Sequence, residues 1–214
     1  MKVMILAAGA GKRLLPLTAV TPKPLLSVRG TPLIERLMRQ LRSAGFNDFI
    51  VNLFHLGEQI ANHLGDGTRL GVKITYSRET RQLETGGGIV QALALLDDAP
   101  FLIVNGDNLT DFDFRLVPEE PGPDLVHLVL APRPEWRVRG DFVFRDGRVV
   151  ARGDTHVYCG IAVVRPELFV NAPPAPFSWN ELMFKAVADG QVSGQVHSGE
   201  WLDVSTPEQY AGVR

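Results

Sequence analysis

The chain has 214 residues, of which 45% are hydrophobic and 21% are charged, and its formal net charge at pH 7 is -2. This composition is typical of a globular protein with a sizeable core, and it argues against long disordered stretches. The nearly balanced charge offers no basic surface for nucleic acid, so any phosphate group would have to be bound at a local site.

The sequence contains no run of 18 apolar residues and no start typical of a secretory leader. Its single cysteine, Cys159, excludes an internal disulfide and a thiolate zinc site, and its apolar surroundings predict a buried thiol. We therefore expect a reduced, cytoplasmic protein, monomeric or a small homo-oligomer, with neither nucleic acid nor membrane as a partner.

In the first half of the chain, short apolar runs alternate with segments of helical periodicity. Strands are predicted at residues 2–8, 49–53, 72–76 and 101–104, and helices at 31–44, 56–64 and 88–96. This alternation predicts an α/β fold with a mixed, mainly parallel central sheet. The chemically unusual turns follow strand ends, which is where open α/β sheets bind their ligands.

The pattern changes after residue 124, where strands follow one another without helices between them. Strands are predicted at residues 125–131, 141–144, 149–152 and 157–164, with a hairpin turn at Asp146-Gly147. Helical spacing returns at 178–189, and a short helix is predicted after Pro207. We interpret residues 1–214 as one domain with two halves, 1–124 and 125–214.

A glycine-rich loop follows the first strand at Gly9-Ala10-Gly11-Lys12-Arg13. Successive backbone N–H groups in such a loop bind anions, and glycine lets the backbone approach a ligand closely. The loop is not a dinucleotide fingerprint, because Leu14 replaces the third glycine. It is not a P-loop either, because Arg13 replaces the serine or threonine. The guanidinium of Arg13 instead suits bidentate contact with a phosphate.

A second cation, Lys23, lies in Thr21-Pro22-Lys23-Pro24-Leu25-Leu26. The flanking prolines hold it in an extended segment, ready to reach the same phosphates.

Residues 7–26 resemble the sugar-1-phosphate nucleotidylyltransferase family, whose pattern runs Ala-Ala-Gly-x-Gly-x-Arg-Leu-x-Pro-Leu-Thr and then Pro-Lys-Pro-Leu. The resemblance implies a three-layer, Rossmann-like nucleotidyltransferase fold, with a nucleotide-binding half (1–124) and a sugar-phosphate-binding half (125–214). It implies that Gly9, Gly11 and Arg13 hold the triphosphate, and that Arg13 and Lys23 are the catalytic cations.

Three consecutive glycines occur in Leu83-Glu84-Thr85-Gly86-Gly87-Gly88, before the helix predicted at 88–96. Such a run leaves a flat space on which a planar base could lie. The resemblance implies a nucleobase site here, formed with Ala8 and Gly9, in which Glu84 or a nearby backbone group reads the base edge. We count Glu84, Gly87, Gly88 and Asn105 among the nucleotide-binding residues.

Two aspartates are candidates for a magnesium site. Asp107 follows the apolar strand 101–104, where a carboxylate needs a cationic partner. Asp203, in Trp201-Leu202-Asp203-Val204-Ser205-Thr206-Pro207, resembles the family's late aspartate, although Ser205 replaces the usual glycine. We expect these two carboxylates to bind Mg²⁺ together with phosphate oxygens and water. Catalysis would then rest on positioning and electrostatics, with the sugar phosphate attacking in line and pyrophosphate leaving beside Arg13.

The sugar side is less clearly marked. No lysine occurs between Lys73 and Lys185, so the contact made by the family's second phosphate-binding lysine is either missing or replaced, with Arg139 and Arg152 as the candidates. Asn180 and Glu181 lie where the family often contacts the sugar.

The length and the motifs look most like the bacterial N-acetylmuramate-1-phosphate uridylyltransferases of cell-wall recycling. UTP and N-acetylmuramate 1-phosphate are therefore the expected substrates. A mannose-1-phosphate guanylyltransferase and a nucleotide-binding regulatory protein without turnover remain alternatives. So does a glycosyltransferase that would use Asp111-Phe112-Asp113.

Overall fold

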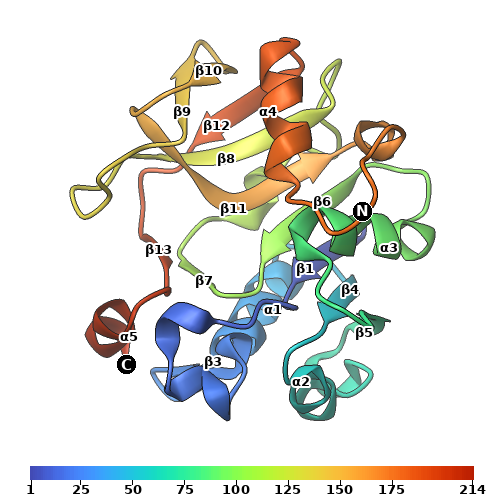
Figure 1. The fold of residues 1–214 in the computed structure, drawn as a ribbon, viewed down its shortest axis with the longest axis vertical. Coiled ribbons are helices and arrows are strands. Elements are labelled where there is room, and N and C mark those ends of the chain that lie inside the picture. The colour runs from blue at the N-terminus through green and yellow to red at the C-terminus, as the bar shows by residue number, and fades with distance from the viewer.

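The structure is a computed structural model that describes residues 1–214. Its main feature is a nine-stranded sheet with the strand order β5-β4-β1-β6-β11-β8-β12-β10-β9 (Figure 1). The strands are β1 (Val3–Leu6), β4 (Asp48–Leu53), β5 (Lys73–Arg78), β6 (Phe101–Asn105), β8 (Val126–Pro132), β9 (Phe142–Arg145), β10 (Arg148–Arg152), β11 (His156–Val164) and β12 (Val192–Val196).

Helices cover both faces of this sheet. The helices are α1 (Leu33–Ser43), α2 (Gly57–Leu64), α3 (Glu84–Leu96), α4 (Asn180–Ala188) and α5 (Pro207–Val213). Apolar side chains of α1 and α2 share one buried cluster with one face of the sheet, and those of α3 and α4 share a second cluster with the other face. The three-layer α/β architecture predicted from the sequence is confirmed. None of the helices combines the length and the apolar character needed to cross a bilayer.

The sheet is mixed, as predicted, but its parallel part is limited. Strands β5, β4, β1 and β6 are parallel, and β8 is parallel to β12. The remaining neighbours are antiparallel, because the chain after β6 returns through turns rather than through helical crossovers. The Asp146-Gly147 hairpin predicted from the sequence joins β9 to β10, and both of its residues have positive φ. Strand β9 also pairs with β11, so that β11, β8, β12, β10 and β9 close into a small barrel.

The sequence analysis missed several short elements and placed one helix start incorrectly. The unpredicted strands are β2 (Ser27–Val28), β3 (Thr31–Pro32), β7 (Asn108–Thr110), β12 and β13 (Trp201–Asp203). Most of these are two or three residues long, too short for a period of two to be recognised. Helix α3 begins at Glu84 instead of residue 88, so the three glycines belong to its first turns.

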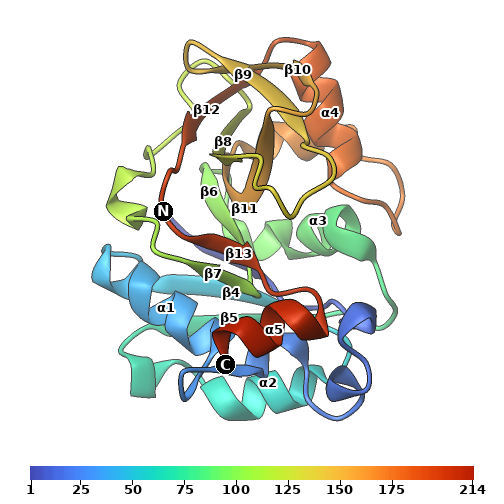
Figure 2. The same ribbon diagram turned by 90° about the vertical axis from the view of Figure 1, so that its left-hand side faces the viewer.

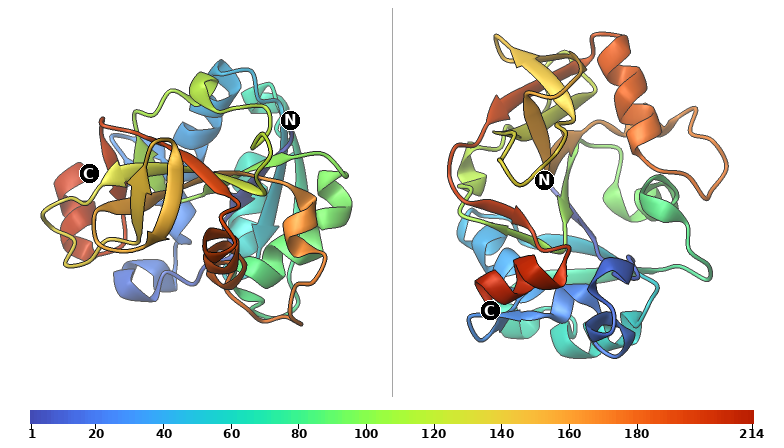
Figure 3. Two further views of the ribbon diagram at one scale, coloured as in Figure 1. Left: turned by 90° about the horizontal axis from the view of Figure 1, so that it is seen from above. Right: turned by 60° about the vertical axis from the view of Figure 1, so that its left-hand side comes forward.

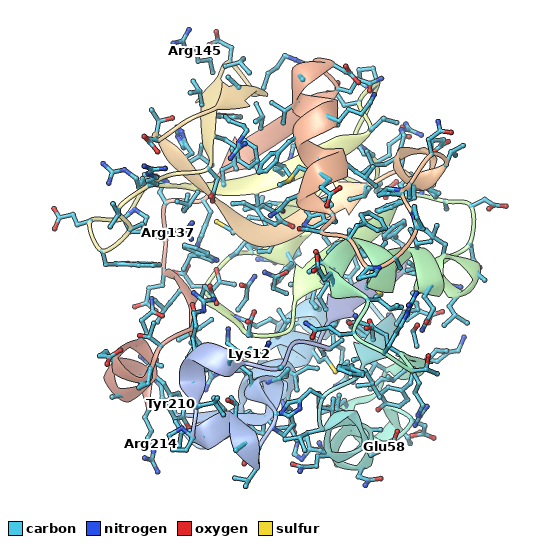
Figure 4. The ribbon with its side chains drawn as sticks, in the orientation of Figure 1. Lys12, Glu58, Arg137, Arg145, Tyr210 and Arg214 are labelled. Atoms are coloured by element: carbon cyan, nitrogen blue, oxygen red, sulfur yellow. The ribbon has the colours of Figure 1, made fainter.

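A third, smaller core joins the two ends of the chain. It consists of Leu14, Leu26, Val28, Leu33, Val204 and Tyr210. The Tyr210 hydroxyl also donates a hydrogen bond of 3.0 Å to the Ser27 carbonyl oxygen. Figure 2 and the right panel of Figure 3 show β13 and α5 running beside the N-terminal segment, and Figure 4 labels Tyr210 between them. This core fixes the segment after the glycine-rich loop against the segment that carries Asp203.

Helices α1 and α2 are linked by a buried carboxylate, Glu35 of α1. It accepts hydrogen bonds from Arg39 and from Arg69, which lies beyond α2, and His63 of α2 lies 2.9 Å from it. The pKa of Glu35 is lowered from 4.5 to about 2, chiefly by the hydrogen bonds from Arg69. Burial opposes this shift, and the bonds with Arg39 and His63 add to it.

We expect Glu35→Gln to lower the free energy of unfolding at pH 7 by about 2 kcal/mol, because it removes a charge that bonds to three partners. The folded pKa lies below the unfolded value, so this stabilisation is present above pH 4.5 and is lost as the pH falls towards 2. Urea unfolding at several pH values measures the difference. Glu58→Gln, which breaks the surface pair with Arg78, is the control and should change little. A Glu35 effect that did not shrink below pH 4.5 would contradict the assignment.

Candidate active site

Two adjoining cavities open at the carboxyl ends of β1 and β6, the edge predicted from the sequence. The first has a volume of 270 Å³ and the second 420 Å³, and both are lined by Leu6, Gly9 and Asp107. The first also contacts the segments that follow β1, including Gly11, Lys12, Arg13, Lys23 and Ser205. The second also contacts Ala8, Asn52, Glu79, Gln82, Glu84, Thr85, Asn105 and Ser178. Together they form one cleft between the two halves of the chain.

The glycine-rich loop forms one wall of the first cavity, and Lys12, labelled in Figure 4, marks its position. Gly11 has φ +60°, and a Cβ atom there would lie 2.8 Å from the Thr18 methyl carbon, so a larger residue would be both strained and crowded. The Thr18 hydroxyl donates to the Gly11 carbonyl oxygen at 2.8 Å. Arg13 follows with a side chain that is 70% exposed, while its neighbour Leu14 is anchored in the third core. The loop therefore presents a largely exposed guanidinium on a fixed backbone.

Lys23 and Asp107 line the first cavity, and Asp203 meets them there through its contact with Lys23. The Lys23 ammonium donates to Asp107 Oδ2 and, at 3.1 Å, to Asp203 Oδ1. An Arg13 guanidinium nitrogen lies 3.8 Å from Asp203 Oδ2. The two catalytic cations and the two metal-binding aspartates predicted from the sequence are thus brought into one cluster.

Strand pairing brings the second aspartate to the first. Strand β13 runs antiparallel to β7, and Asp203 lies opposite Asn108, the residue after Asp107. The Trp201 indole N–H donates to the Cys159 carbonyl oxygen at 2.9 Å, and the Asn108 amide donates to the same oxygen at 2.6 Å. Both small strands are therefore fastened to β11 and hold the carboxylates at a set distance.

The charges around the two carboxylates act unequally. Burial raises the pKa of Asp107, and Lys23 opposes this rise. Burial also tends to raise the pKa of Asp203, but Lys23, the Ser205 hydroxyl and Arg13 outweigh it and hold that pKa below the usual value. Asp203 is thus the better stabilised carboxylate of the pair.

Ser205 is a site residue whose role the sequence analysis did not predict. Its hydroxyl donates to Asp203 Oδ2 at 2.7 Å and it lines the first cavity. In the sequence, only the replacement of the family's usual glycine by Ser205 pointed to this residue. The hydrogen bond to Asp203 depends on how the chain turns between β13 and α5, which the sequence does not show.

The two aspartates form a donor set that fits Mg²⁺. They are hard oxygen ligands aimed at one point, and the point is already occupied by a cationic group, the Lys23 ammonium. The protein supplies no third acidic or histidine ligand here, which suits an ion that usually keeps phosphate oxygens and waters in its shell.

The three glycines of α3 do not form the floor of a base site. A Cβ atom at Gly86 would collide with the Phe177 ring, one at Gly87 would lie 2.7 Å from the Ala175 methyl, and one at Gly88 would lie 2.6 Å from Glu79 Oε1. They allow the loop before α4 to pack on α3, and the Gly86 N–H donates to the Phe177 carbonyl oxygen. Gly87 and Gly88 line neither cavity, whereas Glu84 and Thr85 line the second.

Asn105, at the end of β6, does lie in the cleft. Its side chain rests over Gly160 of β11, where a Cβ atom would be 2.6 Å from the Asn105 amide nitrogen. Gly160 has φ +70°, so glycine satisfies both the backbone and the close approach. Ala8 and Gly9 face the same cavity.

The residues predicted to bind the sugar are not brought to the cleft. Asn180 and Glu181 are exposed at the start of α4, and neither lines a cavity of the cleft. Arg139 is exposed in the loop after β8. Arg152 lies over the Phe184 ring at 4.2 Å from its centroid. Ser178, two residues before Asn180, is the residue of this segment that lines the second cavity.

The Asp111-Phe112-Asp113 motif lies outside the cleft. Asp111 pairs with His197 at 2.9 Å and Asp113 with Arg115 at 2.7 Å, while Phe112 is buried in the first core. These residues line a separate depression beside α1. This placement removes the metal-binding group that a glycosyltransferase would require.

A model of the family described as nucleotidyl transferase matches residues 2–119, the segment that holds the loop, Lys23 and Asp107. The chain belongs to this family. The N-acetylmuramate alpha-1-phosphate uridylyltransferase of Neisseria meningitidis serogroup B is 44% identical to it, over 96% of this chain and 94% of that protein. The protein of the same name from Caulobacter vibrioides is 34% identical, over 96% of this chain and 92% of that protein.

Solved structures show the same fold. A putative glucose-1-phosphate thymidylyltransferase from Bacillus anthracis superposes with a TM-score of 0.86 at 20% identity, covering 100% of this chain and 93% of that one. The three-layer nucleotidyltransferase fold predicted from the sequence is therefore confirmed over the whole chain.

We expect Lys23→Met to destabilise the protein at neutral pH by about 3 kcal/mol, because it leaves two carboxylates facing each other without a cation. Thermal unfolding measures the loss, and millimolar Mg²⁺ should restore part of the melting temperature by binding between the carboxylates. Lys12→Met, at an exposed lysine of the same cavity, is the matched control and should leave stability unchanged. A Lys23 variant as stable as the wild type would show that the cluster is not held by this ammonium.

Proposed function

We propose that this chain transfers the uridylyl group of UTP to N-acetylmuramate 1-phosphate, releasing pyrophosphate. The observation that carries the proposal is the convergence of Arg13, Lys23, Asp107 and Asp203 in the cleft between its two halves. The names of the two uridylyltransferase relatives support UTP and N-acetylmuramate 1-phosphate over GTP and mannose 1-phosphate.

The geometry supports a direct displacement on the α-phosphate. The glycine-rich loop and the exposed guanidinium of Arg13 would hold the β- and γ-phosphates, which leave as pyrophosphate. Lys23 lines the first cavity and bonds to Asp107, which lines both cavities. It would contact the α-phosphate and orient it towards the sugar phosphate. The attacking phosphate oxygen is already anionic at pH 7, so the site needs no general base, and catalysis rests on positioning and charge stabilisation.

Asp107 and Asp203 would hold Mg²⁺. When bound, the ion neutralises charge that builds up on the phosphates during transfer. For the ion to enter, the Lys23 ammonium must turn from the carboxylates towards the substrate, and its flexible four-carbon stem permits this movement.

The second cavity is the proposed base site. Ala8, Gly9, Glu84 and Asn105, predicted from the sequence to bind the nucleotide, all line it. Since a nucleoside triphosphate is the proposed donor, we propose that the reaction takes place in the cytoplasm. The similarity to N-acetylmuramate alpha-1-phosphate uridylyltransferases supports a role in peptidoglycan recycling.

The activity test is pyrophosphate release with Mg²⁺ across four nucleoside triphosphates and three sugar phosphates, the 1-phosphates of N-acetylmuramate, glucose and mannose. We expect turnover with UTP and N-acetylmuramate 1-phosphate. Turnover confined to GTP and mannose 1-phosphate would replace the proposed substrates. UTP binding without turnover on any sugar phosphate would indicate a regulatory protein.

Metal dependence is tested by Asp203→Asn and Asp107→Asn. We expect EDTA to abolish turnover and each substitution to lower kcat by about 10²–10³, since an interaction with developing charge is lost. Binding of Mn²⁺ in the presence of UTP, followed by paramagnetic resonance, gives a readout independent of activity and should weaken in both variants. Glu58→Gln, at an exposed residue outside the cleft, should leave Mn²⁺ binding unchanged. Full activity in EDTA would exclude the ion.

A further inference from the structure

The second cavity contains a buried polar network that the proposed reaction does not use. The Ala7 backbone N–H donates to Asn52 Oδ1 at 2.8 Å, and Asn52 Nδ2 donates to Glu79 Oε1 at 2.8 Å. The Leu83 backbone N–H donates to Glu79 Oε2 at 3.1 Å. Glu79 is 8% exposed and Asn52 is 2% exposed, so water contributes little to the network.

This network joins the two walls of the cavity. Ala7 directly precedes Ala8 and Gly9, which form one wall, and Leu83 directly precedes Glu84 and Thr85, which form the other. Asn52 is the penultimate residue of β4 and Glu79 follows β5, so both side chains come from the sheet edge between these walls. The spacing between the start of the glycine-rich loop and the start of α3 is therefore set through two side chains.

The network needs one carboxylate and one amide side chain between its two backbone donors. Both of its ends are backbone N–H groups, so the chain of bonds must contain a group that accepts from both sides. The Glu79 carboxylate is that group, and the Asn52 amide transmits the bond to Ala7. The two bonds reach separate oxygens of Glu79, and an amide at that position would have to replace one of these oxygens by an N–H group that faces another donor.

Gly88 of α3 packs directly against this network. A Cβ atom at residue 88 would lie 2.6 Å from Glu79 Oε1 and 2.8 Å from the Asn52 amide nitrogen. The third glycine of the run therefore leaves room for this pair of side chains. The need for glycine at this position is explained by the network and not by contact with a base.

We propose that Glu79 and Asn52 are positioning residues for the nucleotide: they fix the two walls of the base cavity so that UTP binds to a preformed site. Burial raises the pKa of Glu79, and the bonds from Asn52 and Leu83 oppose that rise by favouring the carboxylate form. The inference rests on the proposed function, because that function assigns this cavity to the nucleotide.

A reciprocal exchange tests the network. Glu79→Gln alone places an amide N–H against Leu83 N–H or against Asn52. Asn52→Asp alone places two carboxylates face to face. The double variant, Asn52→Asp with Glu79→Gln, restores every bond: the new carboxylate accepts from Ala7 and from the new amide N–H, and the new amide oxygen accepts from Leu83. It also keeps the net charge and the side-chain sizes.

We expect each single variant to weaken UTP binding about tenfold by titration calorimetry, and the double variant to bind within about threefold of wild type. KM for the sugar phosphate should stay within about twofold in all three, since the network borders only the base cavity. A double variant as weak as the two single changes combined would overturn the proposal and indicate direct contact between Glu79 and the base. Lower melting temperatures with unchanged UTP affinity would overturn it as well, and indicate a purely structural role.

Gly88→Ala supplies an independent test if a polar variant does not fold. The added methyl pushes on Glu79 and should also weaken UTP binding. Gly212→Ala in α5, where a Cβ atom would meet nothing within 4 Å, is the matched control. Glu58→Gln with Asn62→Asp, the same exchange on the exposed side of α2, controls for the changed residues.

The two proposals fail separately. UTP binding that follows the expected pattern in a protein without turnover would contradict the reaction and support the positioning role. Turnover by a protein whose UTP affinity does not change with these substitutions would support the reaction and contradict the positioning role.

Discussion

Two carboxylates that share one site repel each other unless a cation lies between them, and much of this structure is arranged around that constraint. The Lys23 ammonium lies between Asp107 and Asp203, while the Arg13 guanidinium approaches from the open side. Three segments far apart in the sequence must therefore meet at one point. The third core brings them together, because Leu14, Leu26 and Val204 pack against one another beside Arg13, Lys23 and Asp203.

The same arrangement explains how one site can be both stable and reactive. Lys23 neutralises two acids in the free protein. In the proposed reaction, a metal ion held by Asp107 and Asp203 would supply that positive charge, and Lys23 would be available for phosphate. The cleft has no need for a permanently buried, unpaired charge, which would be costly.

Most of the architecture and the centre of the site could be predicted from the sequence, because both depend on local patterns. Apolar runs and helical periodicity located most of the sheet and the helices, and residues 7–26 carried a motif long enough to indicate chemistry. What remained unpredicted depends on contacts between distant residues. The pairing of β7 with β13 involves strands of three residues, and the packing of the loop 175–177 on α3 is invisible in the glycine run itself. The sugar-binding residues Asn180 and Glu181 were predicted by analogy, and they do not line the two cavities.

The antiparallel pairing of β7 with β13 also determines when, during translation, the two carboxylates can come together. Lys23 and Asp203 are separated by 180 positions along the chain, so the ribosome finishes residues 1–124 long before Asp203 leaves the exit tunnel. Until then, Lys23 can pair with Asp107 alone, and Leu14 has no Val204 or Tyr210 to pack against. A nascent or truncated chain can thus form much of the sheet and still lack the second carboxylate. The cluster of Lys23, Asp107 and Asp203 can therefore be complete only after translation has passed residue 203.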